Sequence, residues 1–300
     1  MEQHIPVMLD DVIKELEIKH DGIYLDLTLG RAGHSSKILE KLDEGKLICF
    51  DKDKEAIDFS QKKLSQINDR FLLIKRDFRF LKEELEKLKI EKIDGLIADL
   101  GVSSPQLDDI KRGFSYSKDS KLDMRMDLDQ NLTAFEIVNT WDEEKITKIL
   151  IENADVKLAK QVAKAIVKNR PIESSFSLNE IVKKSLPAKV VREKNPSKQI
   201  FQALRIEVND ELHALIDLLK DIVGFTKEGT KLCFITFHSK EDKIVKNFYQ
   251  TLVYQDPRLN KLPIKSTKNW KQKIIYPSAL EISKNSRSKS AKLRVITRME

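Results

Sequence analysis

The chain has 300 residues, of which 40% are hydrophobic and 34% are charged, a balance typical of globular proteins that bury a core. No apolar run is long enough to cross a bilayer, and the N-terminus lacks a basic-then-apolar signal pattern. These features argue against a membrane partner and a secreted protein, so we expect a cytoplasmic one. The net charge of +7 is compatible with a polyanionic partner but does not identify one.

The first hundred residues alternate short apolar runs with amphipathic stretches. Strands are predicted at residues 23–25, 47–50, 71–74 and 93–100. The helices predicted between them span about 35–42, 54–67 and 81–88. Alternation at this spacing predicts a parallel sheet with helices on both faces, as in doubly wound α/β proteins.

The alternation stops between about residues 106 and 204, where helical patterns such as 158–167 and 178–185 occur without a convincing strand. Beyond this stretch we predict a helix at about 208–223, a turn near Gly229, a strand at 231–237, a helix at 242–249 and a last strand at 293–297, while 261–273 is basic and irregular. We therefore predict a Rossmann-like α/β domain made of residues 1–105 and 207–300, with an inserted helical domain at 106–206.

The loop after the first predicted strand carries glycines at positions 30 and 33. Glycine allows a tight turn and lets a ligand approach the backbone, and the N–H groups that open the following helix would face that ligand. The dinucleotide fingerprint Gly-x-Gly-x-x-Gly is incomplete, because Arg31, Ala32 and Gly33 follow Gly30. The loop is therefore either a nucleotide-binding turn or a plain strand-to-helix connection.

Acidic side chains follow several predicted strands at the same edge of the sheet. Asp51 closes the second strand about twenty residues after Gly30, where nucleotide-binding folds place an acid that hydrogen-bonds ribose. Asp53 either competes for this role or caps the next helix. The segment 76–78 after the third strand could border an adenine, and Asp99 at the end of the fourth strand either faces the same ligand or caps its turn. Together they predict a nucleotide-like cofactor.

Five sequence blocks occur in order along the chain. They are HIPVML at 4–9; DGLIADLGVSSPQLD at 94–108; RGFSY at 112–116 with LDMRMD at 122–127; FQALRIEVNDEL at 201–212; and FHS at 237–239 with ED at 241–242 and SAKLR at 290–294. Each block alone is a weak signal. Together, from residue 4 to residue 294, they closely resemble the bacterial RsmH (MraW) family.

This resemblance implies an S-adenosyl-L-methionine-dependent methyltransferase that modifies the N4 atom of a cytidine in the decoding region of 16S rRNA, within the small ribosomal subunit. The cofactor contacts that it implies are Ala32, Gly33, His34, Asp51, Phe78, Asp99 and Gln106. It also implies that the helical insertion helps to recognise the substrate. The family usually has glycine where Ala32 stands, and most of the other departures, such as the basic segment 194–199, lie in the insertion.

The expected chemistry requires positioning, because the N4 lone pair of cytosine is delocalised into the ring. Orientation in the active site can contribute roughly 7–11 kcal/mol, and a proton acceptor a further factor of about 10²–10⁴. Our hypothesis is that Asp99 is the catalytic residue that accepts a hydrogen bond from N4, as well as bordering the cofactor. The chain lacks the Asp-Pro-Pro-Tyr type of motif, so we expect Phe114 or Tyr116 to hold the base instead.

Several other charged residues have two interpretations. His238 follows a predicted strand and either faces the ligand or fixes its own loop. Arg125 and Arg205 either contact phosphate or pair with the nearby acids Asp123, Asp127 and Glu207. Six Lys or Arg residues and no acid occur from 284 to 298, which is either a solvated basic tail or a phosphate-binding segment.

The remaining candidates favour structural roles. Met124 and Met126 are expected to pack, and Cys49 and Cys233 lie in apolar runs typical of buried, reduced thiols. The histidines and cysteines show no ligand spacing, so we expect no metal site. Three alternatives remain open: a methyltransferase with a DNA, protein or small-molecule acceptor, a non-enzymatic rRNA-binding assembly factor, and a nicotinamide oxidoreductase.

Overall fold

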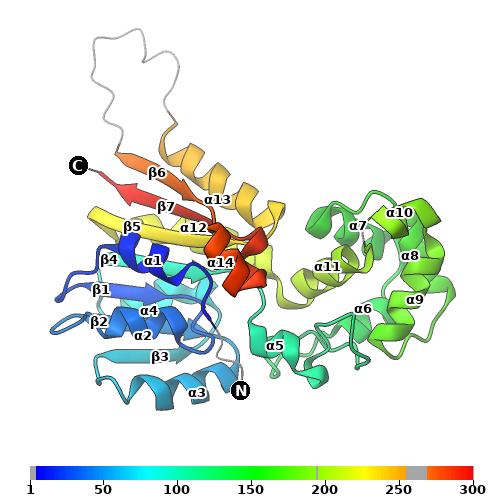
Figure 1. Ribbon diagram of the computed structural model, residues 1–300, viewed down its shortest axis with the longest axis horizontal. Helices are drawn as coiled ribbons and strands as arrows, with labels where there is room; N and C mark the ends of the chain where they lie inside the picture. The colour runs from blue at the N-terminus through cyan, green and yellow to red at the C-terminus, as the bar shows by residue number, and fades with distance from the viewer. Residues whose placement is uncertain (1–4, 194, 255–268, 300) are drawn as a thin grey trace, which may run out of the picture. The chain divides into compact units, whose positions relative to one another are not determined.

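The structure is a computed structural model that describes residues 5–193, 195–254 and 269–299 (Figure 1). The chain forms two compact units. One, the sheet unit, comprises Met1–Gly101 and His213–Glu300, and the other, the helical unit, comprises Val102–Leu212. These boundaries fall a few residues outside the insertion that we expected at 106–206. No helix in the described part of the chain is both long and apolar enough to span a membrane.

The sheet unit is built on one seven-stranded sheet (Figure 1). Its strands are β1 (Ile23–Asp26), β2 (Lys46–Asp51), β3 (Phe71–Lys75), β4 (Ile93–Asp99), β5 (Thr226–Thr236), β6 (Trp270–Ile275) and β7 (Lys292–Arg298). They follow the order β3-β2-β1-β4-β5-β7-β6. The first five strands are mutually parallel, whereas β7 runs antiparallel to both β5 and β6. The parallel part therefore brings the carboxyl ends of β1, β2, β3, β4 and β5 to one edge.

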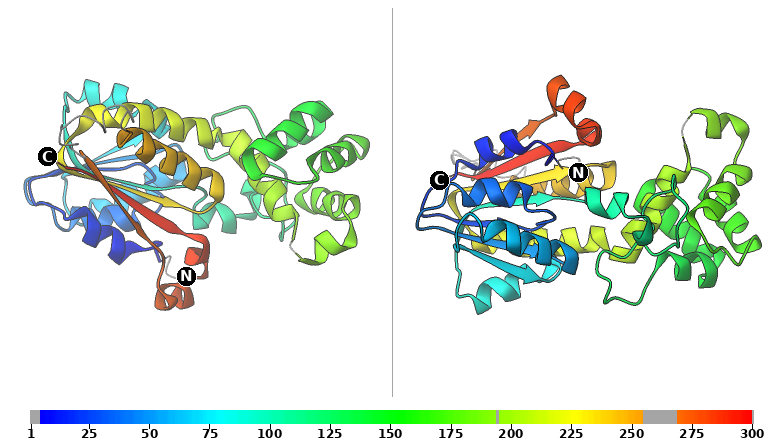
Figure 2. Two further views of the ribbon diagram at one scale, coloured as in Figure 1. Left: turned by 90° about the horizontal axis from the view of Figure 1, so that it is seen from above. Right: turned by 60° about the horizontal axis from the view of Figure 1, so that its bottom comes forward.

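Apolar side chains cover both faces of this sheet, which explains the nearly continuous apolar runs of its central strands. Leu25 and Leu96 pack into the cluster on one face, and their neighbours Tyr24 and Ile97 pack into the cluster on the other. The cluster with Leu25 and Leu96 includes residues of α4 (Leu81–Lys87), α12 (Glu211–Ile222) and α13 (Ser239–Leu252). The cluster with Tyr24 and Ile97 includes residues of α1 (Leu9–Leu16), α2 (Gly33–Leu39) and α3 (Lys54–Leu64). Figure 2 shows these helices on the two sides of the sheet, and the doubly wound prediction is confirmed.

The structure corrects several details at the C-terminal side of the sheet. The helix predicted at 208–223 begins only at Glu211, because Asp210 is left-handed with φ of 50° and separates α12 from the preceding helix. The turn predicted near Gly229 lies inside β5, where Gly229 has φ of 81° and the register with β4 shifts. The expected irregular segment 261–273 lies partly outside the described residues, and its last residues belong to β6.

The second half of the basic C-terminal segment forms a strand of the sheet, whereas Lys284, Arg287 and Lys289 before it are exposed. This strand, β7, lies between β5 and β6, and it follows the short helix α14 (Ala279–Lys284). Arg294 is buried, and its guanidinium donates to Asp242 through Nε at 2.7 Å and Nη2 at 3.0 Å. Lys292 donates to the same carboxylate at 2.8 Å. These charges therefore tie β7 to α13.

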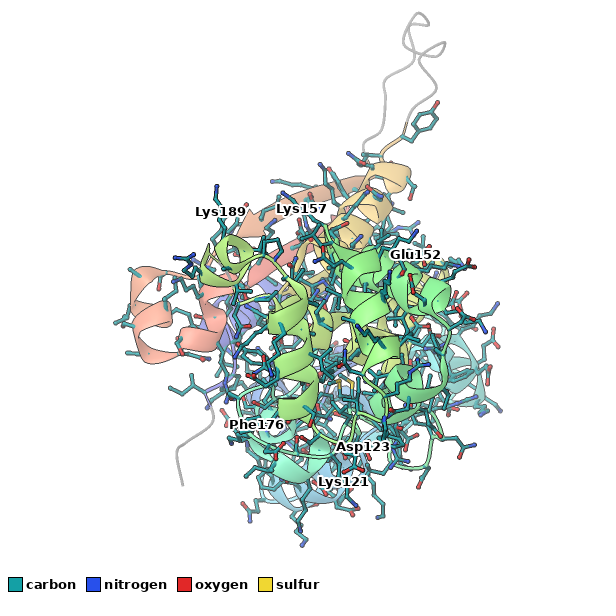
Figure 3. The ribbon with its side chains drawn as sticks, turned by 90° about the vertical axis from the view of Figure 1, so that its right-hand side faces the viewer. Lys121, Asp123, Glu152, Lys157, Phe176 and Lys189 are labelled. Atoms are coloured by element: carbon teal, nitrogen blue, oxygen red, sulfur yellow. The ribbon has the colours of Figure 1, made fainter. Side chains whose placement is uncertain are left out.

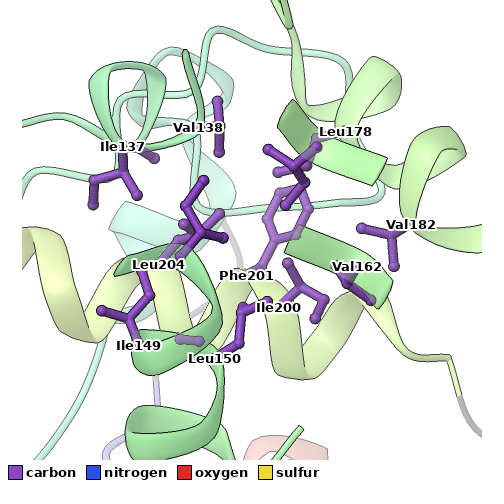
Figure 4. Packing of buried hydrophobic residues seen from close by; sticks show 14 of the residues in the cluster. Ile137, Val138, Ile149, Leu150, Val162, Leu178, Val182, Ile200, Phe201 and Leu204 are labelled. Atoms are coloured by element: carbon purple, nitrogen blue, oxygen red, sulfur yellow. The ribbon is translucent and has the colours of Figure 1, made fainter. Parts of the chain in front are cut away.

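The helical unit has its own hydrophobic core. Its helices are α5 (Ser104–Asp108), α6 (Ala134–Thr140), α7 (Glu143–Ala154), α8 (Ala159–Lys168), α9 (Ser175–Ser185), α10 (Ala188–Glu193) and α11 (Ser197–Asn209). Figure 4 shows Ile149, Val162, Leu178 and Phe201, from four of these helices, meeting in that core. Among described residues, this unit has no strand, only the isolated bridge between Lys121 and Ser174.

Candidate active site at the carboxyl edge of the sheet

The loop that leaves β1 is fixed by the neighbouring strands. The backbone N–H of Leu27 donates to the carbonyl of Ile97 at 2.9 Å, and that of Leu29 donates to the carbonyl of Phe50 at 3.0 Å. The chain then turns through two left-handed residues, Gly30 with φ of 48° and Ala32 with φ of 53°. Among the described residues outside its two chain neighbours, a Cβ on Gly30 would meet only the Thr28 carbonyl oxygen, at 3.9 Å, so they leave that side of the loop open.

Asp51 joins the end of β2 to this loop. One carboxylate oxygen accepts the N–H of Gly30 at 2.8 Å, and the other accepts the N–H of Asp53 at 2.9 Å. Burial raises the pKa of Asp51 to about 6, and these two hydrogen bonds oppose the rise. Each oxygen retains a lone pair for a further donor. Asp53 is the N-cap of α3 and accepts the N–H of Glu55 at 3.1 Å, so it has the capping role.

Gly33 and His34 open α2 beneath the N-terminal segment. A Cβ on Gly33 would lie 2.2 Å from the side chain of Pro6, so the space left by this glycine is filled by the protein's own chain. The imidazole Nε2 of His34 is buried 3.1 Å from the carbonyl of Val7. The backbone N–H of Met8 donates to Glu281 of α14 at 3.1 Å. The N-terminal segment is thus held between α2 and α14.

Phe78 follows β3 at the start of a short 3₁₀ helix, Phe78–Phe80, which Asp77 caps by accepting the N–H of Arg79 at 3.0 Å. The ring of Phe78 is partly buried against the core. Arg76 is used elsewhere, because its guanidinium pairs with Glu83 at 2.7 Å and stacks 4.0 Å from the centroid of Phe80. Within the segment 76–78, Phe78 is therefore the side chain suited to border the adenine ring that we expected there.

Asp99 ends β4 with an unusual carboxyl group. Its backbone N–H donates to the Thr28 hydroxyl at 2.6 Å, whereas Oδ1 is buried and has no hydrogen-bond partner in the described part of the chain. Burial raises the pKa of Asp99 to about 8, and the negative charges of Asp26 and Glu241 contribute to this rise. Buried polar atoms are rarely left without a partner, so this oxygen is a candidate acceptor for a donor that the described residues do not supply.

Two further acids belong to this neighbourhood, although the sequence analysis gave them no role. Asp26 closes β1, accepts the Ser35 hydroxyl at 2.6 Å and the N–H of Thr28 at 3.1 Å, and burial raises its pKa to about 6. Glu241 is buried in the first turn of α13. The position of Asp26 at a strand end is the same signal that singled out Asp51 and Asp99.

His238 fixes its own loop through Nδ1, while its Nε2 is buried and makes no hydrogen bond within the described residues. It is the N-cap of α13, and its Nδ1 accepts the N–H of Glu241 at 3.4 Å. In return, one oxygen of Glu241 accepts the N–H groups of Phe237 at 2.8 Å and His238 at 3.3 Å. His238 Nε2 also lies 2.9 Å from the other oxygen of Glu241. The pair therefore sets the start of α13 beside the end of β5.

Gln106, the remaining predicted cofactor residue, belongs to the helical unit. It occupies the third position of α5, and its side chain accepts the N–H of Ser103 at 3.0 Å in a reciprocal capping arrangement. The expected base-holding residues nearby are packed. Phe114 is 6% exposed in the core, so the expectation that it stacks on a base is wrong for this conformation. Tyr116 is partly buried and meets Phe201 edge-on, with ring centroids 5.8 Å apart.

The two arginines of the helical unit pair with acids. Arg125 donates to Asp123 through Nε at 2.9 Å and Nη2 at 2.8 Å. Arg205 pairs with Glu211 at 2.8 Å, an acid outside the three possible partners that the sequence offered. Met124 and Met126 are buried in the core, as expected. Both guanidinium groups therefore already pair with carboxylates of the protein itself.

The two thiols are buried within the sheet unit. Cys49 and Cys233 are buried and unbonded to each other, and burial raises the pKa of both thiols. The residues that the structure describes contain no group of three or more His, Cys, Asp or Glu side chains placed to hold a metal ion.

Comparison with known proteins identifies the family. The pattern of the MraW methylase family matches residues 1–299. "Ribosomal RNA small subunit methyltransferase H" of Metamycoplasma arthritidis is 62% identical over 284 residues, which cover 95% of this chain and 99% of that protein. The protein of the same name from Mycoplasmopsis pulmonis is 54% identical over 300 residues and covers 100% of both chains. This chain therefore belongs to the MraW methylase family, as its five sequence blocks predicted.

Proposed function

We propose that this protein transfers a methyl group from S-adenosylmethionine to the exocyclic N4 of a cytidine in the decoding region of 16S rRNA, with the small ribosomal subunit as substrate. The names of its relatives support ribosomal RNA as the acceptor. The choice of N4 and of the decoding region is what the resemblance to the RsmH (MraW) family, carried by the five sequence blocks, implies. The observation that carries the chemistry is the buried, unpartnered carboxyl oxygen of Asp99 at the carboxyl end of β4.

The residues of the sheet edge fit the cofactor. S-adenosylmethionine supplies a methyl group made electrophilic by its positively charged sulfur. The free lone pairs of Asp51 suit the ribose hydroxyls, and the open side of Gly30 lets a ligand approach the loop. The backbone at residues 32–34 and the ring of Phe78 complete the contacts that we assign in this unit. Gln106, which the resemblance also implies as a cofactor contact, belongs to the helical unit.

Asp99 is the residue to which we assign the chemical role. Its Oδ1 accepts a hydrogen bond from the amino group, which localises the N4 lone pair and turns it toward the methyl group. A carboxyl group with a pKa of about 8 also suits the proton that N4 releases once it carries the methyl group, because acid–base catalysis is most efficient when the pKa lies near the working pH. Asp26 and Glu241 support this role by disfavouring ionisation of Asp99.

The test is transfer of labelled methyl groups to small subunits that lack the modification, followed by mapping of the modified nucleotide by mass spectrometry. We expect the label on N4 of a decoding-region cytidine. Asp99→Asn keeps the size of the side chain but cannot take up the proton, so it should lose transfer while still binding the cofactor. If the wild type binds cofactor tightly but labels neither subunits nor free rRNA, the acceptor is another molecule and the rRNA proposal is wrong.

A further inference from the structure

A row of lysines runs along the solvent side of α8 in the helical unit. Lys157 lies one residue before the N-cap of α8. Lys160, Lys164 and Lys168 follow within the helix, at intervals of three, four and four residues. Such intervals place side chains on one face of a helix, about 4.5–6 Å apart along its axis. All four lysines are exposed. We call these four residues the basic stripe.

The basic stripe has no internal counter-charge. Within the described residues, no ion pair or hydrogen bond is formed by the ammonium group of any of the four lysines. The sequence contains no Asp or Glu between Asp155 and Glu173. Arg170, the next basic residue, is different, because it donates to the carbonyls of Val138 and Trp141. The charges of the stripe are therefore available to a partner.

The neighbouring helix α7 shows that this arrangement is not general for the unit. There Lys145 and Lys148 are exposed but alternate with acids, and Lys145 lies 3.5 Å from the carboxylate of Asp142. A helix that only needs a solvated face commonly mixes both signs in this way. The absence of acids is thus a local property of α8.

The basic surface extends toward the end of α9. Gln161, on the turn of α8 between Lys157 and Lys164, donates from its side-chain amide to the carbonyl of Ser185. This bond brings the C-terminus of α9 to the stripe, where Lys183 is a further basic residue, whereas Lys184 lies 3.6 Å from the carboxylate of Glu180. Figure 3 views the unit from the side of these helices and labels Lys157 and Lys189 on it. No acid occurs between Glu180 and Glu193 in the sequence.

We propose that the basic stripe binds the phosphate backbone of the RNA substrate; this inference rests on the proposed function. Ammonium groups on flexible stems act as point charges that suit phosphates, and they do not provide the bidentate geometry with which arginine reads guanine. The stripe consequently positions the RNA and does not select its sequence. A continuous single-sign row along one helix also matches a regularly charged strand better than the irregular acids of a protein surface.

Lys160→Gln/Lys164→Gln tests the stripe, and Lys145→Gln/Lys148→Gln on α7 removes the same charge from the mixed surface. Glutamine keeps the helix propensity of lysine. Binding to a 16S rRNA transcript is measured without cofactor over a range of salt concentrations. Each lost phosphate contact should lower the magnitude of the log–log salt slope by about 0.7–0.9, so the stripe variant should lose about 1.4–1.8 and bind roughly tenfold more weakly. The α7 variant should retain the wild-type slope.

Methyl transfer to small subunits separates this inference from the proposed function. If the stripe variant has a raised KM for subunits with an unchanged kcat, the positioning role is supported. If it binds the transcript and methylates subunits as the wild type does, the stripe inference is wrong while the function stands. Weaker binding to subunits with unchanged binding to the transcript would assign the stripe to an acidic protein surface and also overturn it. A wild type that methylates no rRNA would overturn the function instead.

Discussion

The backbone N–H of Gly30 donates to Oδ2 of Asp51 at 2.8 Å, and this bond joins the loop after β1 to the end of β2. The second oxygen of the same carboxylate holds the N–H of Asp53. Asp51 therefore fixes the turn in which Gly30 is left-handed before any ligand binds. A cofactor that hydrogen-bonds Asp51 would meet a preorganised acceptor, which lowers the entropic cost of binding.

Asp51→Asn should weaken cofactor binding and destabilise the loop. The amide group has one acceptor oxygen and an NH₂ that only donates, so this NH₂ must face the N–H of either Gly30 or Asp53. A buried donor left unsatisfied costs about 1–3 kcal/mol. Calorimetric titration with S-adenosylmethionine and thermal unfolding measure the two effects. Asp53→Asn is the matched control, because asparagine also caps helices. Equal loss of affinity in the two variants would contradict a specific role for Asp51.

Gly33→Ala should displace the N-terminal segment, because the added methyl group would lie 2.2 Å from Pro6. Overpacking of this kind costs about 1–3 kcal/mol. Hydrogen exchange should show faster exchange at Met8, whose N–H donates to Glu281. The neighbouring change Ala32→Gly is expected to stabilise the folded protein instead. Glycine removes the strain of a left-handed alanine, about 1–2 kcal/mol, and the greater entropy of the unfolded chain offsets part of this gain. Unchanged protection of Met8 in Gly33→Ala would show that the segment is not held by this contact.

The parallel strands were predictable because their physical signal is local. Strands such as β4 are buried on both faces, so their residues form an apolar run, and Asp99 marks the point where that run ends. The edge strand β6 was not predictable in this way, because Lys271 and Lys273 are exposed and give its sequence a polar character. Its place in the sheet depends on pairing with β7, which no local pattern records.

In the candidate site, too, the residues marked by a local sequence pattern could be predicted, and those that depend on distant contacts could not. Asp51 and Asp99 could be proposed from the sequence because each ends an apolar strand. The role of Gly33 could not, since it depends on contact with Pro6, and the seating of Met8 depends on Glu281, which lies 273 residues away. For Arg205 the sequence could not distinguish phosphate contact from an ion pair. The structure shows the ion pair, because the end of α11 places Glu211 2.8 Å from the guanidinium group.

The pH dependence of catalysis should report Asp99. If its ionised carboxylate accepts the proton from N4, kcat/KM for methyl transfer should rise with pH and level off above the pKa of about 8. Below that pH the carboxyl group is mostly protonated and the reactive form is the minor one. Asp99→Asn should be about 10²–10⁴-fold slower and should lose this rise. A wild-type profile without a rise between pH 6 and pH 9 would exclude Asp99 as the proton acceptor.

The same carboxyl group should make the stability of the protein fall as the pH rises. Its pKa is raised to about 8 in the folded protein, against about 3.9 for an unfolded aspartate, so the folded state binds the proton more tightly between these values. The resulting stability is present below about pH 4 and is lost as the pH rises through 8. Urea unfolding at pH 6 and pH 9 measures the loss, which Asp99→Asn should reduce because asparagine does not ionise. Asp21→Asn, at an exposed position, should behave like the wild type. An Asp99→Asn variant that loses as much stability as the wild type between the two pH values would show that ionisation of Asp99 does not oppose folding.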